Sequence, residues 1–190
     1  MSELPEGVRE APWDSRVLGK AAFEITAWTA AVLEWLSKTP GFFTLKVPSE
    51  TGKGSFESLG FYYCDTLLEP ACNKDRFKGY DDDRASVSKE YDLEKILRIV
   101  DGTFTHDRFH KDRNLTEYCA DMRYKYWLID LHEQERLWAF YYGGDSEPAG
   151  FWSCDERGKI VLHALAMKYR GRGLAKFFWT KGCRMLYGSG

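Results

Sequence analysis

Cysteine is sparse in this sequence and follows no pattern. The five cysteines are odd in number, are scattered over 190 residues and contain no C-x-x-C pair: Cys64, Cys72, Cys119, Cys154 and Cys183. A disulfide framework is therefore not expected, and a reducing compartment fits this usage better. A chain of this length can remove roughly 70% of its extended-chain surface from water, so it needs neither cross-links nor a metal in order to fold.

Long apolar runs are also missing. The first twenty residues hold Glu3, Glu6, Glu10 and Asp14 and no long apolar run, so we expect no signal peptide. No stretch approaches the roughly 18 apolar residues of a membrane span. The composition, with 44% hydrophobic and 29% charged residues but only 6 prolines, is typical of a globular protein and excludes a disordered, collagen-like or coiled-coil chain. These features predict a cytoplasmic protein that has no membrane partner.

Acidic side chains are absent from the C-terminal end of the chain. Between Arg157 and Gly190 there are eight Lys or Arg residues and no Asp or Glu. Because the whole chain has 27 basic and 29 acidic residues, residues 1–156 hold 19 basic and 29 acidic ones, and the net charge of −2 divides into −10 and +8. A segment this basic favours an anionic ligand. The alternative, of equal weight, is a surface whose charge an acidic neighbour balances.

The hydrophobic pattern alternates between strand and helix periodicity, which predicts an α/β protein. In the N-terminal part the expected elements follow a βαβαβ order: strand 20–25, helix 26–37, strand 42–47, helix 55–59 and strand 61–68. The polar segment 71–92 is the best linker candidate. We therefore expect a small α/β subdomain over residues 1–80 and a second domain over residues 86–190.

The second domain is predicted to contain two helices, three strands and a final helix, in the order helix 92–100, helix 116–131, strands 137–142, 149–154 and 159–167, and helix 174–186. Thr116 is the expected cap of the second helix. Gly143, Gly144 and Pro148 predict a turn between the first two strands.

The segment from Lys159 to Trp179, KIVLHALAMKYRGRGLAKFFW, has the clearest chemical signal. It predicts an apolar strand, a loop with two glycines and two arginines, and a helix. Glycines allow a ligand to approach the backbone, and the first N–H groups of a helix lack partners. Together with the helix dipole and the charges of Arg170, Arg172 and Lys176, they predict a site for an anion of pyrophosphate size. A P-loop and a Rossmann fingerprint are excluded, because G-x-x-x-x-G-K-[ST] is absent and Lys176 stands where the third glycine would be.

This segment resembles the GCN5-related N-acetyltransferase (GNAT) superfamily. The family signature [RQ]-x-x-G-x-[GA] is matched by Arg170, Gly173 and Ala175 in RGRGLA, and the preceding strand, the helix and the upstream helix-helix-strand-strand order agree with it. The resemblance implies a GNAT-type mixed sheet flanked by helices, and acetyl-CoA as cosubstrate.

The same resemblance implies the residues that bind acetyl-CoA. The coenzyme A pyrophosphate would be held by one run of backbone, which consists of Arg170, Gly171, Arg172, Gly173, Leu174 and Ala175. Backbone groups near Leu165 and Met167, where the strand splays from its neighbour, would bind pantetheine and face the thioester oxygen. The alternative is a glycine-rich turn made only for packing.

The N-terminal half carries a second resemblance. Its motifs are similar to the TDP-fucosamine acetyltransferase type of GNAT enzyme: Trp13-Asp14-Ser15 with Gly19, Glu57-x-Leu59-Gly60-Phe61, Asp65-Thr66 and Arg108-Phe109-His110-x-Asp112. That type places a small α/β subdomain before the acetyltransferase domain, and its R-F-H-x-D loop lies near the acceptor. The resemblance implies a small-molecule amine acceptor, for which a nucleotide-linked amino sugar is a candidate.

Acetyl transfer to an amine needs a base for the ammonium proton, a donor for the oxyanion and an acid for the thiolate. His163 alternates with Val161 and Leu165 on one strand face and is a candidate base, and a hydrogen-bonded histidine of the core is the alternative. His110 comes from the expected acceptor loop, where capping or solvation explains it equally well. No metal site is predicted, since a solvated turn explains Asp81-Asp82-Asp83 better.

The sequence thus predicts an acyl-CoA-dependent N-acetyltransferase that acts on an amino group of a small molecule. A GNAT domain normally continues past this helix with a strand, a helix and a hairpin that supplies a tyrosine acid, so we expect the chain to be truncated or completed by another chain. The alternative is a noncatalytic or truncated GNAT-like module that binds CoA or a partner chain. An open strand edge favours such pairing, including a homo-oligomer. RNA binding by the basic C terminus is weakest, because Phe177, Phe178 and Met185 fit a packed helix, and no nucleic-acid partner is expected.

Overall fold

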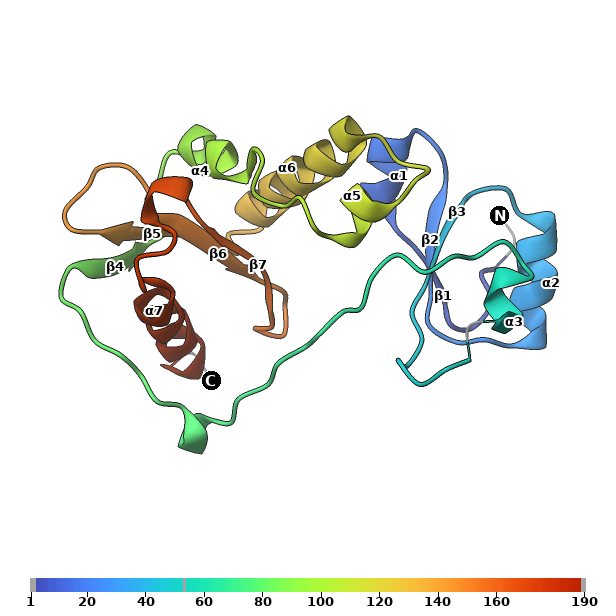
Figure 1. The fold of residues 1–190 in the computed structure, drawn as a ribbon, viewed down its shortest axis with the longest axis horizontal. Helices are drawn as coiled ribbons and strands as arrows, with labels where there is room; N and C mark the ends of the chain where they lie inside the picture. Colours follow the sequence, from blue (N-terminus) through green and yellow to red (C-terminus); the bar gives the residue numbers. More distant parts are fainter. Residues whose placement is uncertain (1–2, 53, 189–190) are drawn as a thin grey trace. The chain divides into compact units, whose positions relative to one another are not determined.

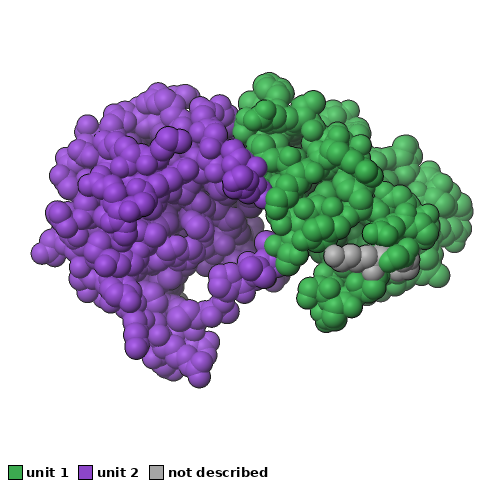
Figure 2. Space-filling view, viewed as in Figure 1, with its two compact units in different colours: residues 1–66, 107–123 green, residues 67–106, 124–190 purple. Residues whose placement is uncertain are grey.

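A computed structural model describes residues 3–52 and 54–188 of the chain (Figure 1). The chain forms two compact units, which Figure 2 colours separately. Both units contain helices and a sheet, so the expected α/β class is confirmed. Among the helices of the described ranges, none has the length and apolar character needed to cross a membrane.

The two units interleave along the sequence. Unit 1 consists of residues 1–66 and 107–123, and unit 2 of residues 67–106 and 124–190. These limits differ from the boundaries 1–80 and 86–190 given above. The later segment of unit 1 is tied to the earlier one by polar contacts from Arg108 to Thr44, from Tyr62 to Asp112 and from Arg123 to Asp14.

Unit 1 is built on a three-stranded sheet in the order β1-β2-β3, with strands β1 (Val8–Glu10), β2 (Ala22–Ile25) and β3 (Phe42–Leu45). The first pair is antiparallel and the second is parallel, with helix α2 (Ala30–Lys38) as the crossover. Thr29 caps α2, since its Oγ1 accepts from the Val32 N–H at 3.3 Å. Phe23 and Ile25 pack with Val32 in the core.

Unit 1 also contains the short helices α1 (Pro12–Leu18), α3 (Gly54–Glu57) and α5 (Arg108–Lys111), and the start of α6 (Glu117–Glu133) up to Arg123. Strand β1 and helices α1 and α5 lay outside the sequence prediction. A three-residue strand has too few positions to show alternation, and α1 has a proline at its first position rather than a polar cap.

The strand predicted over residues 61–68 is wrong. The backbone has no regular secondary structure from Phe61 to Asn73. Phe61 instead packs edge-on against Trp28 with ring centroids 5.8 Å apart, while Leu67 and Leu68 are 70% and 81% exposed. The apolar residues of this segment therefore lack a neighbouring strand that would bury them on one face.

Unit 2 contains a four-stranded antiparallel sheet in the order β4-β5-β6-β7, with strands β4 (Ala85–Ser88), β5 (Leu137–Tyr142), β6 (Gly150–Cys154) and β7 (Ile160–Leu165). The three later strands were predicted, within two residues at most ends. Strand β4 was missed because it lies inside the predicted linker and has only small or polar residues except Val87.

The helices of unit 2 are α4 (Leu93–Val100), the part of α6 (Glu117–Glu133) that follows Arg123, and α7 (Ala175–Gly188). All three were predicted, and Thr116 caps α6 by accepting from the Cys119 N–H at 3.2 Å. Helix α7 lies on one face of the sheet, where Phe178 packs with Phe140 and Trp152 (Figure 1).

A long segment of irregular backbone, residues 67–84, is called the strap here. It contains one 3-10 turn, η1 (Lys74–Arg76), and makes polar contacts with α7. The sequence marked most of it as a linker. In the structure it covers one side of α7, because its peptide groups and carboxylates bond to side chains of that helix.

Candidate functional site

The loop between β7 and α7 is the best candidate for a binding site. Strand β7 ends at Leu165, a 3-10 turn η2 (Met167–Tyr169) follows, and α7 starts at Ala175. Gly171 and Gly173 have φ angles of 69° and 71°, a conformation that costs any other residue free energy. A Cβ atom built on either glycine would meet no atom within 4 Å, so the space beside both is open.

Backbone donors at the start of α7 are available to a ligand. The N–H groups of Phe177 and Phe178 donate to the carbonyl of Leu174, at 3.0 and 3.2 Å, which begins the helix. The N–H groups of Gly173, Leu174 and Ala175 donate to no acceptor in the described part of the chain. Such groups, together with the positive end of the helix dipole, stabilise an anion.

Six of the eight basic residues of the C-terminal segment fall into two groups of three. Three of the eight are neutralised by acidic residues of unit 2, in the pairs Lys159–Glu69, Lys168–Asp145 and Arg184–Asp81. For Arg170, Arg172 and Lys176, the described residues supply no carboxylate within 4.0 Å. Three cations without such a pair therefore lie at or beside the glycine loop, while acidic neighbours balance three of the remaining five.

Arg170 connects the loop to the end of the strand. Its Nε donates to the carbonyl oxygen of Leu165 at 2.7 Å, and its Nη2 donates to Oγ1 of Thr103 at 2.6 Å. Arg172 makes a longer contact, from Nη1 to the carbonyl of Lys168 at 3.5 Å. Arg170 is thus a positioning residue for the loop, whereas Arg172 is freer to reach a ligand.

A tyrosine fixes the turn η2 beside the loop. Tyr169 is buried, and its hydroxyl donates to the carboxylate of Asp145, which also lies 3.2 Å from Nζ of Lys168. The hydrogen bond from Tyr169 and the charge of Lys168 lower the pKa of Asp145. One carboxylate therefore sits next to the basic loop and stays ionised.

Strand β7 has one free edge in the described structure, because it pairs only with β6. The N–H of Ala166 donates to the carbonyl of Ala149 at 2.9 Å, and antiparallel pairs alternate along a strand. Backbone groups of His163 and Leu165 consequently face the free edge. Pairing with β6 continues to Leu165, so the expected splaying of the strand from its neighbour is not seen against β6. Met167 lies beyond the strand, in η2, and its side chain is 76% exposed.

His163 lies on the side of β7 that faces α7. Its ring stands edge-on to Trp179, with centroids 4.7 Å apart, and lies 6.2 Å from Phe178. Desolvation by these neighbours lowers the pKa of His163, although the residue as a whole is exposed by surface area. Neither ring nitrogen has a hydrogen-bond partner among the described residues, in contrast to the alternative of a hydrogen-bonded core histidine. A neutral imidazole with a free nitrogen is suited to accept a proton.

His110 has a different environment, in unit 1. Its Nδ1 lies 2.6 Å from Asp107 and its Nε2 lies 3.3 Å from Asp121, and its side chain is 8% exposed. Asp107 also caps α5 by accepting from the Phe109 N–H at 2.8 Å. Both nitrogens are engaged by carboxylates, which favours a structural role over that of a base.

No family model, curated protein or solved structure matches this chain.

The R-F-H-x-D residues form a packed polar cluster in unit 1. The ring of Phe109 lies between two guanidinium groups, 4.2 Å from Arg108 and 3.8 Å from Arg123. Asp112 is buried and accepts from the hydroxyl of Tyr62; burial and this bond raise the pKa of Tyr62 to about 12. The motif thus holds its own segment against the first 66 residues.

Two features escaped the sequence prediction. Glu24, buried on the central strand of unit 1, has Arg9, Lys46 and Arg108 within 4.0 Å. Burial raises its pKa, but Lys46 and Arg9 outweigh this effect and lower the pKa. The sequence does not predict that Glu24 is buried among basic side chains, because a glutamate in a strand is ordinarily expected to face solvent. Two residues of the acidic run at 81–83 also form ion pairs, Asp81 with Arg184 and Asp82 with Arg84.

Proposed function

We propose that the protein is an acyl-CoA-dependent N-acetyltransferase of the GNAT type, which transfers an acetyl group to an amino group of a small molecule. The observation that carries the proposal is the loop from Arg170 to Ala175, which combines open glycine positions, unpaired N–H groups and cations without carboxylate partners. The order of two helices, three antiparallel strands and a helix in unit 2 supports it.

The residues present fit the anionic half of acetyl-CoA. The N–H groups of Gly173, Leu174 and Ala175 would hold the pyrophosphate, with Arg172 and Lys176 supplying charge. When bound, acetyl-CoA supplies the acetyl thioester. A packing turn alone would explain the glycine conformations, but it would not explain three cations left without carboxylates at the same loop.

The free edge of β7 suits the rest of the cosubstrate. The backbone groups of His163 and Leu165 on this edge would bind the amide groups of pantetheine, and a backbone N–H here would stabilise the developing oxyanion. Met167, which follows this strand edge in the sequence, has an exposed side chain that would lie next to the bound pantetheine. The carbonyl of Leu165 already accepts from Arg170, so its N–H is the group left for a ligand.

His163 is the best candidate for the base. Because its pKa is lowered, the imidazole is neutral at neutral pH, and the residue is exposed. It would take the proton from the ammonium group of the acceptor. His110 would instead support the acceptor loop through Asp107 and Asp121. A nucleotide-linked amino sugar is our candidate acceptor, on the strength of the motif resemblance in unit 1.

The activity is tested by measuring thiol release from acetyl-CoA in the presence of a panel of amines that includes nucleotide-linked amino sugars. We expect release that depends on both substrates and falls at least tenfold in a His163→Gln variant. His132→Gln, which removes a histidine bonded to Tyr91, is the matched control and should leave the rate unchanged. A folded protein that neither binds acetyl-CoA nor releases thiol with any amine would overturn the proposal.

A noncatalytic module is the second candidate, and the free edge of β7 favours it. An unpaired strand edge offers backbone groups to a strand of another chain. In this case acetyl-CoA or CoA would bind without turnover, or the protein would form stable oligomers in sedimentation measurements. A monomer that acetylates an amine would exclude this candidate.

A further inference from the structure

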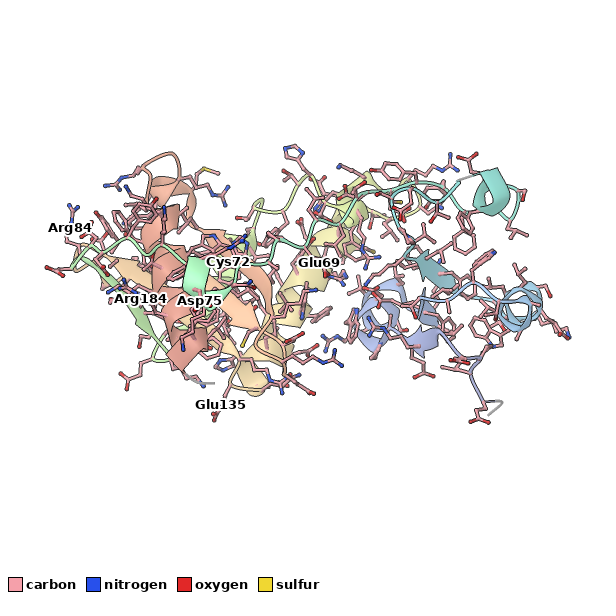
Figure 3. The ribbon with its side chains drawn as sticks, turned by 90° about the horizontal axis from the view of Figure 1, so that it is seen from below. Glu69, Cys72, Asp75, Arg84, Glu135 and Arg184 are labelled. Carbon is pink, nitrogen blue, oxygen red and sulfur yellow. The ribbon has the colours of Figure 1, made fainter. Side chains whose placement is uncertain are left out.

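The strap is attached to one side of α7 along most of its length. The N–H of Tyr80 donates to Oγ1 of Thr180 at 2.9 Å, and Nη2 of Arg184 donates to Asp81 at 3.0 Å. Nearer the end of the helix, the hydroxyl of Tyr187 donates to the carbonyl of Cys72 at 2.9 Å. Figure 3 labels Cys72 and Arg184 in this region of unit 2.

The strap approaches α7 very closely. A Cβ atom on Gly79 would lie 2.7 Å from Nη2 of Arg184 and 3.1 Å from Cγ2 of Thr180, so only glycine fits without a shift. Further along, Nζ of Lys74 donates to the carbonyl of Tyr187 at 3.3 Å, and the ring of Phe77 lies 5.5 Å from that of Tyr187. These contacts attach the strap to the C-terminal half of α7.

Cys183 belongs to the side of α7 that faces the strap. At 3.6 residues per turn, the strap-contacting residues Lys176, Thr180, Arg184 and Tyr187 fall within a sector of roughly 80°. Cys183 extends this sector by only about 20°. Its side chain is partly buried, as expected for a position beneath the strap.

Cys72 lies over the same turn of the helix. Side chains of an α-helix lean toward its N-terminus, so the ring of Tyr187 covers the turn that contains Cys183. The hydroxyl of Tyr187 holds the backbone of Cys72 there. Consistently, burial and the nearby thiol of Cys72 both raise the pKa of Cys183. Both cysteines therefore belong to the contact between the strap and the end of α7, although 110 residues separate them in the sequence.

We propose that Cys72 and Cys183 form a reversible disulfide bond that fastens the strap to α7. A low-molecular-weight disulfide such as glutathione disulfide is the oxidant. The exposed thiol of Cys72, as thiolate, attacks it and forms a mixed disulfide with release of one glutathione thiolate. The thiolate of Cys183 then attacks the sulfur of Cys72 and releases the second. In total, two protein thiols are oxidised to one disulfide and one glutathione disulfide is reduced to two glutathione molecules.

The other three cysteines have separate environments. Cys64 lies by Asp112 and Cys119 lies by the carbonyl of Val17, both in unit 1, with sulfur-to-oxygen distances of 3.9 and 4.0 Å. Cys154 is buried in the sheet core of unit 2. The proposed cross-link therefore involves only the pair Cys72 and Cys183. A single reversible bond of this kind does not require the many paired cysteines of a disulfide framework.

Peptide mapping tests this proposal. The full chain carrying Cys64→Ser is equilibrated with glutathione disulfide, blocked with an alkylating reagent and digested with trypsin without reduction. The Cys64 substitution is needed because Cys64 and Cys72 share the tryptic peptide 54–74, while Cys183 lies in the peptide 182–184. We expect mass spectrometry to detect these two peptides linked, and reduction to separate them.

Two variants serve as controls. Cys64→Ser combined with Cys183→Ser should lose the linked peptides and keep glutathione on Cys72, whereas Cys64→Ser combined with Cys119→Ser should still form them. The oxidised protein should also unfold at a temperature higher by on the order of 5–10 °C, since a long loop is closed. Glutathione on Cys72 without linkage in the chain with Cys183 intact, linkage to another cysteine, or thiols that stay free would each overturn the proposal. This test does not depend on acetyl-CoA binding.

Discussion

The carbonyl oxygen of Leu165, the last residue of β7, accepts a hydrogen bond from Nε of Arg170 at 2.7 Å. This contact joins the strand that would bind pantetheine to the loop that would bind the pyrophosphate. The same guanidinium reaches Thr103 at 2.6 Å. The first residue of the RGRGLA motif is therefore used to shape the site, and its neighbours are left to contact the anion.

Replacement of Arg170 by alanine should loosen the loop. Two hydrogen bonds are lost, and because the side chain is exposed we expect a loss of about 1 kcal/mol in unfolding free energy. The affinity for acetyl-CoA should fall further than this, because the loop would no longer be held in its binding conformation. Urea unfolding and calorimetry measure the two effects. Equal stability and equal affinity in the variant would contradict the positioning role.

Gly173→Ala places a side chain on a residue whose φ is 71°. Nothing lies within 4 Å of the new Cβ, so the cost arises from the backbone alone, about 1–2 kcal/mol. Gly19→Ala is the matched control, since Gly19 has a φ of 64° and open surroundings in unit 1. Both variants should lose similar stability, but only Gly173→Ala should weaken acetyl-CoA binding. Equal affinities of the two variants would argue against the loop as the site.

His163 should make stability depend on pH. Its folded-state pKa lies below the ordinary value of 6.5, so the unfolded chain takes up a proton first as the pH falls. The contribution of His163 to stability is therefore full above pH 6.5 and declines as the pH drops through 6.5 toward the folded-state pKa. Urea unfolding at pH 7.5 and 5.5 should show a smaller loss for His163→Gln than for the unmodified protein. An unchanged difference would mean that the imidazole is not desolvated.

The buried pair of unit 1 gives a prediction on stability. Nε of Arg123 donates to Asp14 at 2.6 Å, and both side chains are less than a tenth exposed. Asp14→Ala leaves a guanidinium buried without this partner, which costs about 3–5 kcal/mol. Thermal unfolding should show the transition of unit 1 at lower temperature. Asp14→Ala combined with Arg123→Met should recover part of the loss, and a double variant worse than the sum of both would contradict this explanation.

Two glycines of unit 2 should respond oppositely to alanine. On β6, a Cβ at Gly150 would lie 2.5 Å from the carbonyl oxygen of Ala164, so Gly150→Ala should cost about 1–3 kcal/mol. On α7, a Cβ at Gly182 would lie 3.4 Å from the ring of Trp152, an ordinary contact. Gly182→Ala should therefore be neutral or stabilise by up to about 1 kcal/mol. Urea midpoints compare them directly, and a destabilised Gly182→Ala with an unaffected Gly150→Ala would refute this packing.

Much of unit 2 is predictable because its elements have strong local patterns. Strands β5, β6 and β7 and helix α7 were recognised from apolar periodicity, and the loop between the last two from its glycines and arginines. Strand β4 was missed because only its pairing with β5, which lies about 50 residues away, makes it a strand. The prediction of a strand at 61–68 was wrong for the converse reason, because this segment has apolar residues but pairs with no strand among the described residues.

The candidate site was predictable in part. Sequence spacing places Arg170, Arg172 and Lys176 near one helix end, and within residues 3–52 and 54–188 no carboxylate lies within 4.0 Å of them. The sequence pattern does not predict the ion pair between Asp145 and Lys168, because this contact joins the turn between β5 and β6 to η2, which are separate in the chain. Nor did it indicate that the strap covers α7, since such contacts depend on long-range packing of polar residues.

Calorimetric titration of the full chain with acetyl-CoA is the most direct test of the central claim, that the loop Arg170–Ala175 binds the pyrophosphate of coenzyme A. We predict one binding site per chain, competition by CoA, and at least a tenfold loss of affinity in Arg172→Ala combined with Lys176→Ala. Arg157→Ala, which removes an exposed charge of the same basic segment outside the loop, should bind as the unmodified protein does. Absence of binding by the folded protein, or equal affinity in the loop variant, would contradict the account.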